Sequence, residues 1–124
     1  MRFLNTDKAP KAIGPYSQCT EANGTYYLSG QIGFDPTTMQ FAGASVEEQC
    51  KQVFKNIKAV LAIDNLNLNN IIKASVFLTD MANFSVVNEI YAKAFGDHKP
   101  ARECVAVKQL PANALVEITV IAVR

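Results

Sequence analysis

The last quarter of the chain carries an apolar pattern that predicts two long strands. Residues 99–124 are rich in Val, Ile, Leu, Cys and Ala, residue types that suit the pleated, half-buried surface of a sheet. A break at residues 111–114 (PANA) indicates a short turn between the two strands. We therefore expect an antiparallel hairpin in this region.

Two charged residues interrupt these strands. Glu117 stands between Val116 and Ile118, and a buried carboxylate is costly unless it is paired, hydrogen-bonded or protonated. Arg102 is the only arginine away from the chain ends, and its planar guanidinium suits bidentate binding of a carboxylate, although a strand arginine is also commonly a surface or salt-bridged residue. The turn decides whether the two side chains share a face, because a slip of one residue moves Glu117 to the other side.

Two segments show the spacing of amphipathic helices. In residues 45–64, Ser45 precedes Glu48 by three positions, the pattern of a capping box, and apolar residues recur at helical spacing. Residues 84–95 repeat the helical pattern, and Gly96 supplies a stop. Both helices should pack one apolar face on a sheet.

The remaining apolar segments predict further strands. Residues 71–79 are almost continuously apolar, which is typical of a central strand. Asn23 and Gly24 lie between two β-compatible runs and predict a tight hairpin, and residues 2–5 predict a short edge strand. The order of elements predicts an α+β fold, a mixed β-sheet with two helices packed on one face. Since the other face would expose a large apolar surface, we expect it to pair with further copies of the chain.

Composition limits the classes of function. The chain has 124 residues, enough for one domain over residues 1–124, and 12 basic against 11 acidic side chains give a formal charge of +1. No basic run is present, which argues against nucleic-acid and membrane-surface binding unless folding gathers a patch. No apolar run is long enough to span a membrane.

Cysteine and histidine usage argues against a metal or disulfide framework. Cys19, Cys50 and Cys104 are odd in number and far apart, no CxxC occurs, and His98 is the only histidine. We therefore expect no metal site, and reduced thiols in a cytoplasmic protein.

Four polar or small positions have both a functional and a structural interpretation. Ser29 and Gly30 at a strand end would let a ligand approach the backbone, or would simply form a turn. Asn88 lies at the edge of the apolar face of the second helix, where a solvated side chain is common. His98 is a possible acid or base, although a loop histidine beside lysine is usually solvated.

Several motifs together resemble the RidA (YjgF) family over essentially the whole chain. They are AIGPYSQ, YLSGQI, VFLTDMANFSVVNEIY, PARECVAVKQLP and VEITVIAV. The resemblance implies the fold of trimeric chorismate mutase and a homotrimer with clefts between subunits. It also implies cofactor-free hydrolysis of 2-imino acids, such as 2-iminopropanoate (in equilibrium with 2-aminoacrylate) and 2-iminobutanoate, to 2-oxo acids and ammonia. Such intermediates are released by pyridoxal-phosphate-dependent dehydratases.

The resemblance also implies a role for each site residue. Arg102 matches the arginine that clamps the substrate carboxylate, Glu117 the acid that holds the attacking water, and Cys104 the thiol beside it. These three would come from one subunit and most of the remaining wall from its neighbour. The residues that match the wall of the cleft are Tyr16, Ser29, Gly30 and Asn88.

Two positions depart from the family pattern. Lys99 stands where an aromatic residue often precedes the PAR motif, in a loop that is shorter than usual, and Glu103 replaces a small residue. Strand alternation should point Glu103 away from Arg102 and Cys104. These departures bear on substrate range.

Two other functions fit the same family. One is an endoribonuclease or translation inhibitor, against which a charge of +1 and a single histidine argue. The other is a non-catalytic trimer, either chaperone-like or binding small carboxylates through Arg102.

Overall fold

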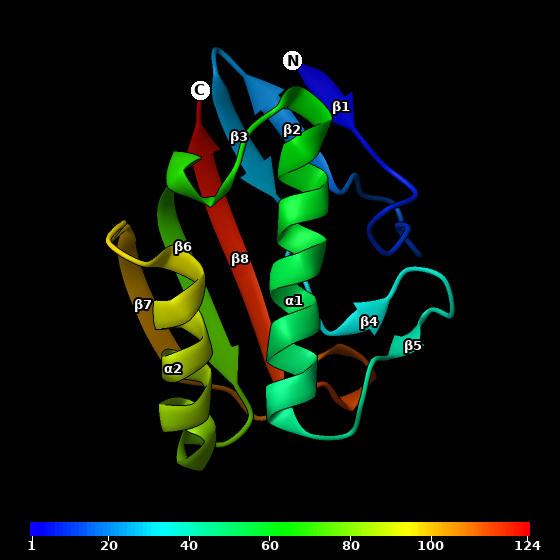
Figure 1. The fold of residues 1–124 in the computed structure, drawn as a ribbon. Helices are drawn as coiled ribbons and strands as arrows, with labels where there is room; N and C mark the ends of the chain where they lie inside the picture. The colour runs from blue at the N-terminus through cyan, green and yellow to red at the C-terminus, as the bar shows by residue number, and fades with distance from the viewer.

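The computed structural model describes residues 1–124 as a six-stranded sheet with two helices against one face (Figure 1). The helices are α1 (Val46–Leu61) and α2 (Phe84–Phe95). The sheet has the order β1-β2-β3-β8-β6-β7 and contains β1 (Arg2–Leu4), β2 (Cys19–Ala22), β3 (Thr25–Leu28), β6 (Ile71–Leu78), β7 (Ala101–Ala106) and β8 (Val116–Val123). A small second sheet pairs β4 (Phe34–Asp35) with β5 (Gln40–Phe41). The predicted α+β fold is confirmed.

Local capping chemistry explains where the helices begin and end. The side chain of Ser45 accepts a hydrogen bond from the backbone N–H of Glu48, whose own side chain accepts from the backbone N–H of Ser45, as the capping box predicts. Before α2, the side chain of Asp80 accepts from the N–H of Ala82. Gly96 ends α2 with a φ of 60°, a conformation that favours glycine.

The tight hairpin predicted at Asn23 and Gly24 is confirmed. It joins β2 to β3, and the φ values of the two residues are 53° and 81°. Positive φ at both central positions matches the right-handed twist of the flanking strands.

The hairpin expected in residues 99–124 is wrong, because β6 lies between β7 and β8. Strand β7 runs parallel to β6 on one side, and β8 runs antiparallel on the other. The physical reason is the crossover through α2, which returns the chain to the start of β6 and makes the next strand parallel to it. Residues 107–115 then cross to the far side of β6, where alternate residues of β8 are buried beneath the helices.

The core lies between the helices and the sheet, and the other face of the sheet is uncovered (Figure 1). On that face, Phe3 and Tyr27 occupy one lateral row across the strands and are 68% and 50% exposed. Val105 lies level with Phe77 and Glu117 and is 44% exposed. Apolar side chains at this exposure are typical of an interface.

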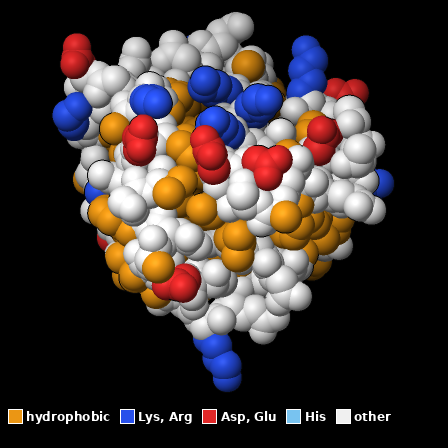
Figure 2. Space-filling model, turned by 60° about the horizontal axis from the view of Figure 1, so that its bottom comes forward, with side chains coloured by type: hydrophobic (Ala, Val, Ile, Leu, Met, Phe, Trp, Pro, Cys, Tyr) orange, Lys and Arg blue, Asp and Glu red, His pale blue; other side chains and the backbone are white.

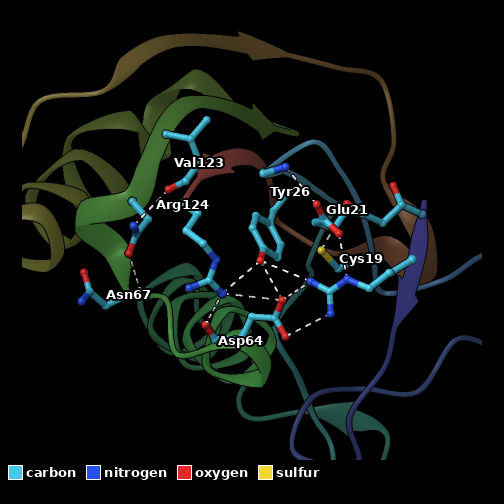
Figure 3. A network of polar contacts seen from close by, with 11 residues as sticks. Cys19, Glu21, Tyr26, Asp64, Asn67, Val123 and Arg124 are labelled. Atoms are coloured by element: carbon cyan, nitrogen blue, oxygen red, sulfur yellow. Dashed lines mark hydrogen bonds and ion pairs between the residues drawn. The ribbon is translucent and has the colours of Figure 1, made fainter.

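A network of charges joins both chain ends to Asp64, which lies three residues after the end of α1 (Figure 3). Asp64 forms ion pairs with Arg2 and, at 3.7 Å, with Arg124, and its carboxylate accepts from the Tyr26 hydroxyl at 2.7 Å. Arg2 also donates to Glu21 at 2.8 Å. Each carboxylate in the network therefore has a cationic partner from the same chain.

No helix in the structure has the length and apolar character needed to cross a membrane.

Candidate active site

The predicted site residues fall into two groups on opposite faces of the sheet. Arg102 lies level with Ala74 of β6, which is buried beneath the helices, and Cys104 shares this face. Glu117 lies level with Phe77, an odd number of positions along β6 from Ala74 and therefore on the uncovered face. The expectation that Arg102, Cys104 and Glu117 line one cleft from one subunit is wrong for this chain, because the pairing registers of β7 and β8 on β6 put Glu117 on the opposite face from the other two.

The first group, which we call the arginine half-site, comprises Asn88, Arg102 and Cys104. The Nη1 of Arg102 donates to Oδ1 of Asn88 at 2.7 Å. The guanidinium carbon lies 4.7 Å from the ring centroid of Tyr91 and 5.7 Å from that of Phe84. No carboxylate of the chain pairs with Arg102, and its Nε and Nη2 groups donate no hydrogen bond within the chain. The amide and the two rings thus fix the position of the guanidinium, while its charge remains available to bind a ligand.

Two groups near Arg102 are poorly placed to act as nucleophile or base. Burial raises the pKa of the Cys104 thiol, and the Arg102 charge only partly opposes this, which favours the thiol over the nucleophilic thiolate. His98 places its Nε2 2.6 Å from the carbonyl oxygen of Ile71, so this nitrogen is engaged with the backbone. A pocket of about 290 Å³ beside Arg102 is lined in part by His98 and Lys99.

The second group, which we call the glutamate half-site, comprises Tyr16, Ser29, Gly30 and Glu117. Three of these, Tyr16, Gly30 and Glu117, line a pocket of about 110 Å³. Glu117 is half-buried, no residue of the chain bonds to its carboxylate, and burial raises its pKa. Ser29 Oγ donates to the Ser17 carbonyl at 2.6 Å, which fixes the backbone before Gly30.

Gly30 is required by its closeness to the carboxylate. A Cβ added at Gly30 would lie 2.9 Å from Cδ of Glu117 and 3.0 Å from Oγ1 of Thr119. Any side chain here would push Glu117 out of its position.

Glu103 points away from the arginine half-site, as strand alternation predicts. Its carboxylate accepts from the Ser75 hydroxyl and pairs with Lys73 at 3.0 Å on the uncovered face. These two bonds, that from Ser75 first, lower the pKa of Glu103. Its negative charge is neutralised away from Arg102.

The sequence alone does not reveal that Phe84 and Tyr91 are neighbours of Arg102, because both fit the pattern simply as apolar residues of a helix. The available signal is spacing: Phe84, Asn88 and Tyr91 follow one another at intervals of four and three on α2, and so share one face. An arginine on a neighbouring strand that packs against this face of α2 therefore contacts all three side chains.

A comparison with known proteins identifies the family. The family model described as endoribonuclease L-PSP matches residues 6–124. The chain belongs to the endoribonuclease L-PSP family. Within this L-PSP group, a crystal structure of RidA from the Antarctic bacterium Psychrobacter is 41% identical, covers 100% of both chains and superposes with a TM-score of 0.96. The resemblance to RidA proteins is confirmed.

Other L-PSP relatives carry more specific names. The crystal structure of Escherichia coli TdcF with bound serine is 38% identical, covers 100% of this chain and 99% of that chain, and has a TM-score of 0.95. Reactive Intermediate Deaminase A, chloroplastic, from Arabidopsis thaliana is 44% identical over 119 residues, 96% of this chain and 64% of that protein. The L-PSP family therefore includes reactive intermediate deaminases, while the name of its model refers to an endoribonuclease.

Proposed function

We propose that the chain is a cofactor-independent deaminase that hydrolyses 2-imino acids, including 2-iminopropanoate and 2-iminobutanoate, to 2-oxo acids and ammonia. The observation that carries this proposal is Arg102, a guanidinium fixed by Asn88 and two aromatic rings yet without a carboxylate partner in the chain. Its free Nε and Nη2 donors suit a substrate carboxylate. The serine bound to TdcF is a small molecule with the same carboxylate group.

The complete active site forms between copies of the chain in a homotrimer, where the arginine half-site of one copy meets the glutamate half-site of the next. Two observations support this assembly. Arg102 and Glu117 lie on opposite faces of the sheet, so one copy cannot bring both to one substrate. The uncovered face also exposes Phe3, Tyr27 and Val105, which association would bury.

The reaction uses few protein groups. Arg102 holds the carboxylate of the iminium form of the substrate, and Glu117 accepts a proton from water as the water oxygen bonds to the iminium carbon and the C=N π electrons pass to the nitrogen. In the resulting neutral carbinolamine, Glu117 returns that proton to the nitrogen, and the carbon–nitrogen bond breaks with its electron pair leaving on ammonia. The hydroxyl proton then passes to Glu117, which leaves the 2-oxo acid. A raised pKa makes Glu117 a better proton acceptor than an ordinary carboxylate.

The decisive experiment compares Arg102→Ala with wild type. A dehydratase generates 2-aminoacrylate, and ammonia release is measured with Arg124→Ala as the matched control, since Arg124 belongs to the Asp64 network. We expect Arg102→Ala to lower kcat/KM by at least about a hundredfold and Arg124→Ala to leave it unchanged. Equal rates for Arg102→Ala and wild type would reject the deaminase and leave the non-catalytic trimer as the better interpretation.

A second candidate function, RNA cleavage, is favoured by one surface feature. Figure 2 shows basic side chains gathered on one face beside acidic ones, and a groove of about 510 Å³ between α1 and α2 is lined by four lysines, Lys51, Lys55, Lys58 and Lys93. Lys51 pairs with Glu47 at 3.0 Å and Lys93 with Glu89 at 3.5 Å, so only two lysines stay free for phosphate. Substituting both Lys55→Glu and Lys58→Glu should abolish any RNA cleavage and leave ammonia release unchanged.

We also place the chain in the cytoplasm. Its three cysteines form no disulfide, which suits a reducing compartment. Because the Arabidopsis relative is named chloroplastic, fractionation of the native cells is the test, and recovery in an organelle would contradict this localisation.

A further inference from the structure

Arg102 lies on the outermost strand of the sheet, where a long side chain would normally be mobile. Strand β7 pairs only with β6, and its residues are mostly exposed. A free arginine side chain loses considerable rotamer entropy when it binds a ligand. Whatever holds the guanidinium before the ligand arrives therefore increases affinity.

The aromatic ring of Tyr91 is the most firmly held of the groups around Arg102. Tyr91 is 8% exposed, and its ring packs against Phe95 at 4.6 Å and against Phe54 at 6.0 Å between centroids. Phe84, the other ring near Arg102, is only partly buried and lies farther from the guanidinium. Tyr91, Phe54 and Phe95 pack together between the two helices, and Tyr91 is the one member of this cluster whose ring contacts the Arg102 guanidinium.

Contact with an aromatic face and a hydrogen bond at one corner leave the guanidinium little freedom. The centroid of the Tyr91 ring lies 4.7 Å from the guanidinium carbon, and Nη1 donates a hydrogen bond to Asn88. The edge formed by Nε and Nη2 stays open for a bidentate carboxylate. Orientation of that edge is what a carboxylate clamp requires.

We propose that Tyr91 is a positioning residue, whose ring fixes the guanidinium of Arg102 for carboxylate binding. The proposal rests on the role of Arg102 proposed above. The ring alone is sufficient, because the Tyr91 hydroxyl is buried and has no hydrogen-bond partner in the chain. Phenylalanine would preserve the ring and break no bond, whereas methionine would fill similar space without an aromatic face.

The test measures binding of 2-oxobutanoate, a stable 2-oxo acid, by titration calorimetry. We expect Tyr91→Phe to bind as wild type does and Tyr91→Met to bind about tenfold more weakly. Phe95→Met is the matched control, since Phe95 is 6% exposed in the same cluster but makes no cation–π contact with Arg102. It should lose thermal stability without losing affinity. Equal Kd values for Tyr91→Met and Phe95→Met would overturn the proposal.

Testing Tyr91→Met again in an Arg102→Lys protein separates a positioning role of the ring from a general structural effect. Lysine at position 102 carries the charge without a planar group to lie against the ring, so Tyr91→Met should weaken binding much less in the Arg102→Lys protein. An unchanged tenfold loss in that background would contradict positioning. In ammonia-release assays, Tyr91→Met should raise KM more than it lowers kcat.

The outcomes also distinguish this inference from the proposed function. If wild type binds 2-oxobutanoate through Arg102 but releases no ammonia, the deaminase is wrong and the positioning role stands. If wild type releases ammonia and Tyr91→Met binds normally, only the positioning role is wrong. Absence of binding to wild type would reject both.

Discussion

The arginines of the Asp64 network and the arginine on strand β7 have opposite kinds of partner. In the Asp64 network, Arg2 and Arg124 meet a carboxylate of their own chain, and Tyr26 adds a further hydrogen bond (Figure 3). At the opposite edge, Arg102 meets an amide and two rings but no carboxylate. A charge that is neutralised within the chain stabilises the fold, whereas one that is only positioned keeps its capacity to bind a ligand.

The acidic residues show the same contrast. Hydrogen bonds from Arg2 and Tyr26 lower the pKa of Asp64, while burial raises the pKa of Glu117, whose carboxylate forms no ion pair within the chain. Opposite pKa shifts indicate opposite roles: Asp64 is most stable as the ion at neutral pH, and Glu117 is prepared to take a proton.

Trimers that contain two different variants give the strongest test that Arg102 and Glu117 act from different copies of the chain. Arg102→Ala and Glu117→Gln chains, each inactive alone, should recover activity when unfolded together and refolded, because some clefts then join a native Arg102 to a native Glu117. Random mixing of two chains predicts about one quarter of the wild-type rate of ammonia release. A mixture as inactive as its parents would show that the two half-sites do not meet.

Glu117→Gln should separate activity from stability. Loss of the proton acceptor should lower kcat by about a hundredfold or more. Since burial raises the pKa of Glu117, the native state disfavours its ionised form, and the variant should melt at a slightly higher temperature than wild type at pH 8. This difference should shrink as the pH falls through the raised pKa and vanish below the ordinary pKa of glutamate, where Glu117 is protonated in both the folded and the unfolded state. In wild type, kcat should fall over the same acidic range.

The smallest effect on activity is expected from a change in the Asp64 network. Asp64→Asn removes the ion pairs with Arg2 and Arg124, and should lower the melting temperature at pH 7 by a few degrees while ammonia release per folded protein stays unchanged. A lowered pKa stabilises the fold above the ordinary value for aspartate, and this contribution is lost as the pH falls. The two proteins should therefore melt alike in strong acid. An Asp64→Asn protein with full stability would remove the structural role given to this network.

Local signals in the sequence were sufficient wherever neighbouring residues decide the outcome. The capping box at Ser45, the stop at Gly96 and the hairpin at Asn23 and Gly24 all depend on residues within four positions of one another. The special position of Arg102, the one arginine away from the chain ends, was equally visible. The motifs also predicted the family correctly.

Tertiary structure alone decided which strands are neighbours, and with that the division of the site. The sequence predicts a hairpin turn at residues 111–114, but in the structure the crossover through α2 places β7 on one side of β6 and β8 on the other. Strand order depends on how distant segments share the buried face beneath the helices, which no local pattern encodes. That choice put Arg102 and Glu117 on opposite faces. The sequence by itself thus determined which groups can do the chemistry, and the packing of the sheet determined that one copy of the chain cannot bring them together.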